Sequence, residues 1–177
     1  MTTYPAWQAG QRITAGRLRS GQPDWTSKPS DEPIASSTTL QADDHLTSPV
    51  LGGSAYTFLA QLFIGSGSSD ADIRVAFDFP AGSVCHFGGT GAHPGALTSG
   101  TSGVVDFFPM RAAAPGGGGD TFLAFGISSA FNTWVRIEGT LAAAADGDLT
   151  LMWAQNAPDA TETRVLAGSS MEVRRRS

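Results

Sequence analysis

The side chains of this chain that could bind a metal ion are three histidines and a few clustered acids. His45 directly follows the acids at 43–44, while His86 and His93 lie seven residues apart beside a glycine-rich stretch. A transition-metal site needs three or four converging nitrogen, oxygen or sulfur ligands, and no recognised ligand spacing is present. The acids at 43–44 and 70–72 offer the oxygen ligands that Ca²⁺ prefers, but neither has the pattern of a calcium loop. We therefore predict no metal site and no cofactor.

Sequence motifs of hydrolases and phosphate-binding enzymes are also not found. There is no Gly-x-Ser-x-Gly elbow in a strand–helix context. Lys28 is the only lysine and does not belong to a phosphate-binding loop, and the glycines at 116–119 are not followed by a helix and a lysine. Carboxylate pairs of glycosidases converge in space, so the sequence does not single one out. We predict a non-enzymatic protein, in which the lone Cys85 is a small core residue without an intrachain disulfide.

Composition narrows the class of protein further. The chain has 177 residues, a formal net charge of −5 and 15% charged residues. The acidic balance argues against a general nucleic-acid-binding protein. No apolar run reaches the roughly 18 residues of a membrane span, and no secretory signal is recognised, so we expect synthesis in a cytoplasm. The low charge fits a surface covered by neighbouring subunits, or simply a β protein rich in Ser and Thr.

The elements that must position these residues are predicted most clearly between residues 133 and 173. Apolar residues alternate with polar ones in three runs, at 133–141, 148–155 and 169–174, which is typical of half-buried strands. The turn at 146–148 contains Asp-Gly, which reverses a chain at low cost. The side chains predicted to face the core are Val135, Ile137, Leu141, Leu149, Leu151, Trp153, Met171 and Val173. We interpret this region as the closing sheet of a β-sandwich.

The preceding part of the chain is predicted to contain further short strands and glycine-rich loops. The strand at 56–64 is apolar on both faces, which predicts a central strand covered on both sides. The remaining predicted strands are 34–40 with a turn at 42–44, an edge strand at 46–50, an amphipathic strand at 73–79, and strands at 84–87, 104–110 and 121–127, with loops at 88–103 and 112–119. Residues 30–177 are thus predicted to form an all-β, jelly-roll-like antiparallel sandwich.

Residues 1–29 differ from the rest and are predicted to be an extended anchoring arm. A short helix is expected at 14–21, between a threonine cap and a glycine stop. The arm has a charge of +3, and its large apolar residues are too widely spaced to form a core of their own. It therefore suits a strap on another surface, or else a solvated tail. The residues predicted to contact a partner are Trp7, Arg12, Ile13, Arg17, Leu18, Arg19 and Trp25.

The other tryptophans and the C-terminal arginines have alternative roles. Trp153 is in phase with the core positions of its strand and is predicted to be buried. Trp134 is out of phase with Val135 and Ile137, so it is either exposed, where it could stack on a sugar ring, or buried at a subunit contact. Arg174 and Arg175 either bind an acidic partner surface or belong to a solvated tail.

Several stretches together resemble virion proteins of tailed phages that infect actinobacteria. The leading segment that carries the resemblance is Trp7-x-x-Gly10-Gln11-Arg12-Ile13-Thr14-Ala15-x-x-Leu18, and an opening strand pair lies at 37–46. The closing module comprises Gly139-Thr140-Leu141, residues 147–156, residues 160–161 and residues 165–171. The central stretch 87–119 is not part of the resemblance. Such proteins are minor tail, fibre or head-decoration proteins, which implies a structural setting and no particular chemistry.

These observations predict a non-enzymatic structural protein of a bacteriophage particle, assembled in the host cytoplasm. The favoured interpretation is a capsid-surface decoration or head-fibre protein, anchored by its arm to the major capsid protein or another virion subunit. A homo-oligomer is expected, most plausibly a trimer. The alternatives are a minor tail or tail-fibre protein, a carbohydrate-binding host-adhesion module, and an accessory domain of a bacterial enzyme. No nucleic-acid or membrane partner is expected.

Overall fold

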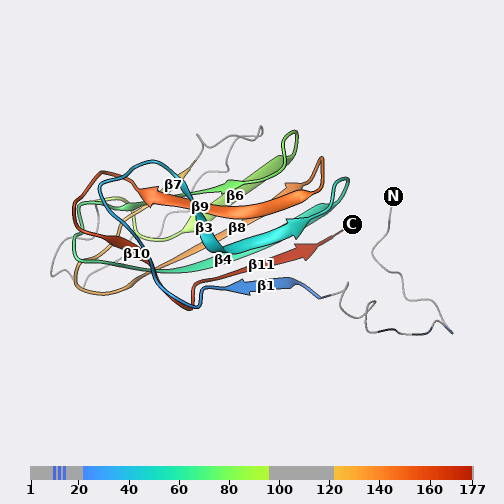
Figure 1. The fold of residues 1–177 in the computed structure, drawn as a ribbon, viewed down its shortest axis with the longest axis horizontal. Helices are drawn as coiled ribbons and strands as arrows, with labels where there is room; N and C mark the ends of the chain where they lie inside the picture. The colour runs from blue at the N-terminus through green and yellow to red at the C-terminus, as the bar shows by residue number, and fades with distance from the viewer. Residues whose placement is uncertain (1–9, 11, 13, 15–21, 96–121, 177) are drawn as a thin grey trace.

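The computed structural model describes residues 10, 12, 14, 22–95 and 122–176, and these form two antiparallel β-sheets packed face to face (Figure 1). The strands are β1 (Asp24–Ser27), β2 (Glu32–Ile34), β3 (Gln41–Val50), β4 (Ala55–Ser66), β5 (Ile73–Asp78), β6 (Val84–Thr90), β7 (Leu123–Phe125), β8 (Thr133–Ala142), β9 (Gly147–Gln155), β10 (Thr163–Val165) and β11 (Ser170–Arg175). The described part of the chain contains no helix, and hence none that could cross a bilayer. The predicted all-β sandwich is confirmed.

β4 is the central strand of the seven-stranded sheet. It pairs with β8 along its length, while its other edge pairs first with β11 and then with β10. β1 extends the sheet beyond β11, β6 lies beyond β8, and β2 lies beyond β10. The second sheet has the order β3-β9-β5-β7, so β3 is an edge strand, as the proline at position 49 predicted.

The core lies between the two sheets and contains the residues that the two-residue period places there. All eight predicted core side chains of β8, β9 and β11 are buried, and Trp153 is fully inaccessible. Phe77 joins the sheets, because its ring packs 4.7 Å from the ring of Phe58 and 5.1 Å from that of Phe87. Cys85 is a buried core residue, as predicted, and burial raises the pKa of its thiol to about 12.

The prediction that β4 is covered on both faces is wrong. Its even-numbered residues face the core, whereas the odd-numbered residues from Ala55 to Gly65 are half-buried or exposed. Leu59 and Phe63 therefore lie on the surface of the molecule. The apolar residues on the outer face of β4 are therefore part of the molecular surface and are not covered by a second layer.

The strand and turn predicted at 34–44 are also wrong in part. β2 ends at Ile34, residues 35–40 have no strand, and β3 passes through the predicted turn. The pairing of β3 with β9 is irregular between Ala42 and Thr47. Here Asp43 Oδ1 accepts the backbone N–H groups of His45 (3.0 Å) and Leu46 (2.9 Å), which diverts them from the ladder. A local carboxylate thus produced a bulge within a strand where turn composition suggested a reversal.

The glycine-rich stretch predicted as a loop at 88–103 begins as strand. β6 continues to Thr90, and Gly89 and Gly91 face the aromatic ring of Phe125. A Cβ atom at either glycine would lie 2.7 Å from that ring, so both positions need to lack a side chain. The strand predicted at 121–127 is shortened to β7. The strand at 104–110 and the loop at 112–119 lie outside the described residues.

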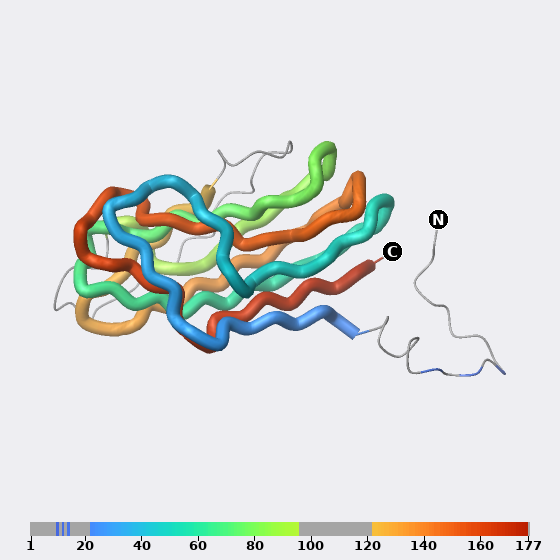
Figure 2. The backbone as a smooth tube through the Cα atoms, viewed as in Figure 1, coloured from blue at the N-terminus to red at the C-terminus, as the bar shows by residue number. Residues whose placement is uncertain are grey.

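The seven-stranded sheet begins within the range predicted as an arm. Asp24 to Ser27 pair with β11, and the backbone N–H of Lys28 donates to Ser169 O at 2.8 Å. Figure 2 shows β1 and β11 side by side, at opposite ends of the colour scale. Arg12 is described and exposed. The other predicted arm residues (Trp7, Ile13, Arg17, Leu18 and Arg19), and the helix predicted at 14–21 beyond Thr14, lie outside the described part.

Candidate binding face and cleft

The outer face of the seven-stranded sheet brings together three of the predicted contact residues. Cross-strand partners share a face, so Trp25 lies with its partner Glu172, and Arg174 lies with Thr57. Trp134 is also on this face. Trp25 is 58% exposed and Trp134 is 40% exposed. Arg175 has the opposite phase, pairs with the core residue Tyr56, and is half-buried.

Phe63 and Trp134 form an exposed aromatic pair on the outer face. They are direct partners in the pairing of β4 with β8, and Phe63 is 39% exposed. Side chains directly opposite each other in an antiparallel pair are close neighbours, so these two aromatic side chains lie next to each other on the outer face. Trp134 is exposed in the isolated chain, and its predicted role at a subunit contact stays a prediction. Phe63 was overlooked, although it is out of phase with Leu62 and Ile64 in the same way.

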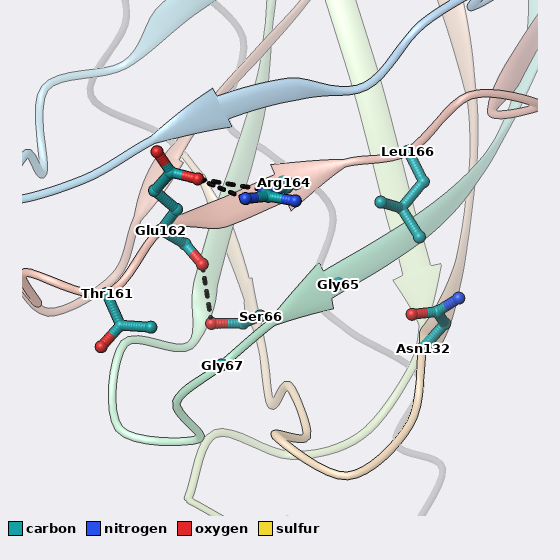
Figure 3. Close-up of a pocket in the computed structure, with 8 residues that line it drawn as sticks. All are labelled: Gly65, Ser66, Gly67, Asn132, Thr161, Glu162, Arg164 and Leu166. Atoms are coloured by element: carbon teal, nitrogen blue, oxygen red, sulfur yellow. Dashed lines mark hydrogen bonds and ion pairs between the residues drawn. The ribbon is translucent and has the colours of Figure 1, made fainter.

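A cleft of about 420 Å³ opens on the same side of the sheet. Figure 3 shows the residues that line it. The cleft lies where β4, the turn before β8 and the segment around β10 meet. Its lining residues are Gly65, Ser66, Gly67, Asn132, Thr161, Glu162, Arg164 and Leu166. The backbone N–H of Leu166 donates to Phe63 O at 2.8 Å, which places one wall of the cleft directly beside the aromatic pair.

The cleft exists because two of its positions have no side chain. A Cβ atom at Gly65 would lie 3.3 Å from Asn132 Oδ1 and 3.3 Å from a methyl carbon of Leu166. A Cβ atom at Gly67 would lie 3.0 Å from Thr161 Cγ2. Larger residues at either position would project into the space that the cleft occupies.

One wall of the cleft carries an ion pair between Glu162 and Arg164. Arg164 Nη2 and Nε donate to Glu162 Oε2 at 2.6 Å and 3.1 Å, and both side chains are about half exposed. Hydrogen bonding and charge from Glu162 raise the pKa of Arg164, so the guanidinium stays protonated. The pair has no net charge, and it presents both donors and acceptors to the cleft.

The segment that carries Thr161 and Glu162 is fixed from beneath. Gln155 is fully buried, and its Nε2 donates to Thr161 O at 2.9 Å while its Oε1 accepts the N–H of Asp159 at 3.1 Å. Asp159 in turn accepts the N–H of Thr161 (2.7 Å) and the hydroxyl of Ser68 (2.8 Å). These hydrogen bonds lower the pKa of Asp159. The cleft wall is therefore held in place before any ligand arrives.

A second cluster of ionisable groups lies at β2 and β3 and is closed by the only lysine. Oxygen and nitrogen atoms of Glu32, Asp43 and His45 lie within 4.8 Å of one another. Lys28 Nζ donates to Asp43 Oδ2 at 2.7 Å and to Glu32 Oε2 at 2.5 Å, and the lysine and aspartate side chains are both fully buried. The ammonium group pairs with both carboxylates, so we interpret the cluster as an internal ion network.

The remaining candidate chemistry is dispersed over the fold. His86 is exposed on β6, and His93 lies beside the loop at Asp72. Asp72 is buried, has a positive φ of 46° and accepts the N–H of Gly95 at 3.1 Å. Desolvation raises the pKa of Asp72, and backbone hydrogen bonds oppose this shift. The structure does not bring the three histidines together.

The comparisons with known proteins leave the family open. No family model matches the sequence, and no curated protein matches it either. Two structures of infectious bursal disease virus, of the Gt and Gx strains, match at 12% identity with TM-scores of 0.20 and 0.19. The matches cover 86% and 97% of this chain, which spans only 40% and 43% of the viral chains. Likenesses at this level do not establish a shared fold.

Proposed function

We propose that this protein is a non-enzymatic structural component of a bacteriophage particle, which attaches to a neighbouring virion subunit. The sequence resemblance at both ends of the chain supports this setting. The outer face of the seven-stranded sheet supports a role in attachment, because it presents large apolar side chains together with charges of both signs. Aromatic residues and arginine are the types enriched at protein interfaces.

The observation that carries the attachment role is the position of the exposed tryptophans. Trp25 and Trp134 come from strands at different places in the sheet but project from the same face. Full burial of one large apolar side chain contributes roughly 1.5–3 kcal/mol. Two tryptophans, with Phe63 beside one of them, would therefore offset part of the entropy lost when a subunit docks.

The arm and the outer face form the attachment surface in this proposal. β1 extends the sheet at its edge, so the chain that precedes Asp24 starts beside Trp25. The proposal assigns Arg12, Arg17 and Arg19 of this segment to acids of the same partner. We place the protein on the exterior of the capsid as a homotrimeric decoration or head-fibre protein. Attachment to the tail is the alternative.

The first experiment is to purify particles and locate this chain in them. The proposal predicts that it is present by mass spectrometry and that cryo-electron microscopy finds its density on the capsid lattice. Density at the tail alone would move the protein to the alternative location. Absence from purified particles would refute the virion role.

The anchoring surface is tested with two kinds of variant. Deletion of residues 1–21 removes the arm but leaves β1 and Lys28 in place, whereas a deletion through Pro29 would remove both. Trp25→Ser with Trp134→Ser changes the outer face, and Thr140→Val on β8 is the control. We expect the deletion and the double substitution to reduce incorporation into particles, and the control to retain it. Full incorporation of both test variants would refute this anchoring surface.

A further inference from the structure

The cleft between β4, β8 and β10 differs from the rest of the outer face because it is concave and polar. Its volume of about 420 Å³ falls within the roughly 300–1,000 Å³ typical of small-molecule sites. A subunit contact across a sheet does not need such a hollow. Its residues come from three segments far apart in the sequence, so the hollow is a property of the fold.

The polar groups of the cleft suit a neutral ligand with many hydroxyl groups. Asn132 offers an amide, Thr161 a hydroxyl, and Glu162 and Arg164 a carboxylate and a guanidinium that neutralise each other. An anion would compete with Glu162 for Arg164, and a cation would face the same guanidinium. An apolar ligand would find only Leu166. Hydroxyl groups, which both donate and accept, match this set of partners.

The aromatic pair next to the cleft supplies an apolar contact of the kind that such a ligand needs. Phe63 lies two residues before Gly65 on the same face of β4, and Trp134 lies two residues after Asn132. A pyranose ring has hydroxyl groups around its edge and carbon-bound hydrogens on its faces. The edge hydroxyls of one sugar unit would occupy the cleft, and the next unit would rest its face on the electron-rich rings.

We infer that this cleft binds a neutral saccharide, with the Phe63–Trp134 pair as its stacking platform. The site is preorganised, because Gln155 and Asp159 fix the wall that carries Thr161 and Glu162. The inference does not depend on the virion role, since it concerns binding by the isolated chain. Phe63 and Trp134 also belong to the proposed attachment surface, so a saccharide and a neighbouring subunit would compete for this pair, and saccharide binding is therefore measured on the isolated chain.

The sequence offers matched controls for this site. Arg136 and Glu138 form a second exposed ion pair with the same i,i+2 spacing on the outer face, with 3.1 Å between Nη2 and Oε2, but they do not line the cleft. Arg164→Met is therefore compared with Arg136→Met. Gly65→Val fills the cleft, and Thr57→Val places the same side chain on the same face of β4, away from the cleft.

The experiment titrates isotopically labelled protein with neutral disaccharides of glucose, galactose, mannose and N-acetylglucosamine, followed by amide chemical shifts. We expect saturable shifts at Gly65, Ser66 and Asn132 with at least one sugar. Gly65→Val, Arg164→Met and Asn132→Ala should weaken binding at least about tenfold, as expected when oriented polar contacts are lost or blocked. Arg136→Met and Thr57→Val should bind like the original chain.

Three outcomes would overturn the inference. The first is the absence of saturable shifts with every sugar of the panel. The second is binding that Gly65→Val, Arg164→Met and Asn132→Ala leave unchanged. The third is a response at these amides to inorganic sulfate but to none of the sugars, which would make the cleft an anion site. If Gly65→Val does not fold, the Arg164 and Asn132 variants still decide the question.

Discussion

The Lys28 network and the Glu162–Arg164 pair each join a cationic side chain to a carboxylate, but in opposite environments. In the first, a lysine and an aspartate with fully buried side chains lie 2.7 Å apart between the edge of the seven-stranded sheet and β3. In the second, an arginine and a glutamate are about half exposed beside a cleft. Removing one partner of a buried pair leaves an uncompensated charge, whereas an exposed pair contributes little to stability. The buried pair is therefore expected to matter for stability, whereas the exposed pair can contact a ligand.

The largest expected effect comes from breaking the buried network. Lys28→Met should reduce the free energy of unfolding by about 3–5 kcal/mol, because Asp43 loses its counter-charge in the interior. Denaturant unfolding followed by tryptophan fluorescence measures the change. Lys28→Met combined with Asp43→Asn should recover part of the loss, since the amide oxygen can still accept the N–H groups of His45 and Leu46. A single variant as stable as the original chain would contradict this assignment.

Substitution of Gln155 tests whether a buried polar side chain holds the exposed wall of the cleft in place. Gln155→Leu should lower the free energy of unfolding by about 2–3 kcal/mol, because Thr161 O and the N–H of Asp159 lose their partner. It should also weaken saccharide binding, because the wall at Thr161 and Glu162 is released. The two effects are measured by denaturant unfolding and by sugar titration of the folded variant. Destabilisation with unchanged binding would show that the cleft does not depend on this support.

Asp72 represents a third case, a buried carboxylate for which desolvation outweighs the opposing effects of two backbone N–H groups and of His93. Desolvation raises its pKa above the ordinary value of 3.8. The folded state therefore holds its proton more tightly than the unfolded state, and the associated stability is lost as pH rises through the folded-state pKa. Asp72→Asn, which suits the positive φ and can still accept the N–H of Gly95, should be more stable than the original chain at neutral pH.

The pH dependence provides the check on this prediction. The advantage of Asp72→Asn should shrink as pH falls towards 3.8, where the carboxyl of the original chain becomes protonated. Thermal unfolding at several pH values measures the difference. A constant difference across this range would show that the charge of Asp72 is not its cause.

The smallest effect on stability is expected at the cleft. Arg164→Met should leave the midpoint of denaturant unfolding unchanged, because both members of the pair are about half exposed. The same substitution should reduce saccharide binding, so its effects on stability and binding separate. A marked loss of stability would place the pair with the Lys28 network and remove the contrast between the two regions.

The fold was predictable where one face of a strand meets the core and the other meets solvent. Val135, Ile137 and Trp153 were placed correctly because the period of two is unambiguous in β8 and β9. The bulge at Asp43 was missed, since a side-chain oxygen that binds N–H groups within a strand has the same composition as a turn. The prediction of a loop missed that Gly89 lies in a strand. A glycine is needed there because the ring of Phe125, which is distant in the sequence, packs against it.

The cleft could not be predicted in the same way. Gly65, Asn132 and Arg164 are ordinary residues of strand ends and turns, and only the pairing of β4 with β8 and β10 makes them neighbours. Only one member of the exposed aromatic pair was predicted from the sequence, because the phase of Trp134 in its strand showed that it faces away from the core. Its partner Phe63 lay in a strand interpreted as covered on both sides, which hid the significance of its phase.

The pairing of β1 with β11 has a consequence for the order of events during synthesis. Asp24 and Val173 are partners, and β4 needs β11 along its first half, so the sheet joins segments made at opposite ends of the described chain (Figure 2). A ribosome that has produced only the first hundred residues has released β1 and β4 without the strand that lies between them. The sheet therefore closes only after β11 has left the exit tunnel, and until then β1 and β4 expose edges that chaperones could protect.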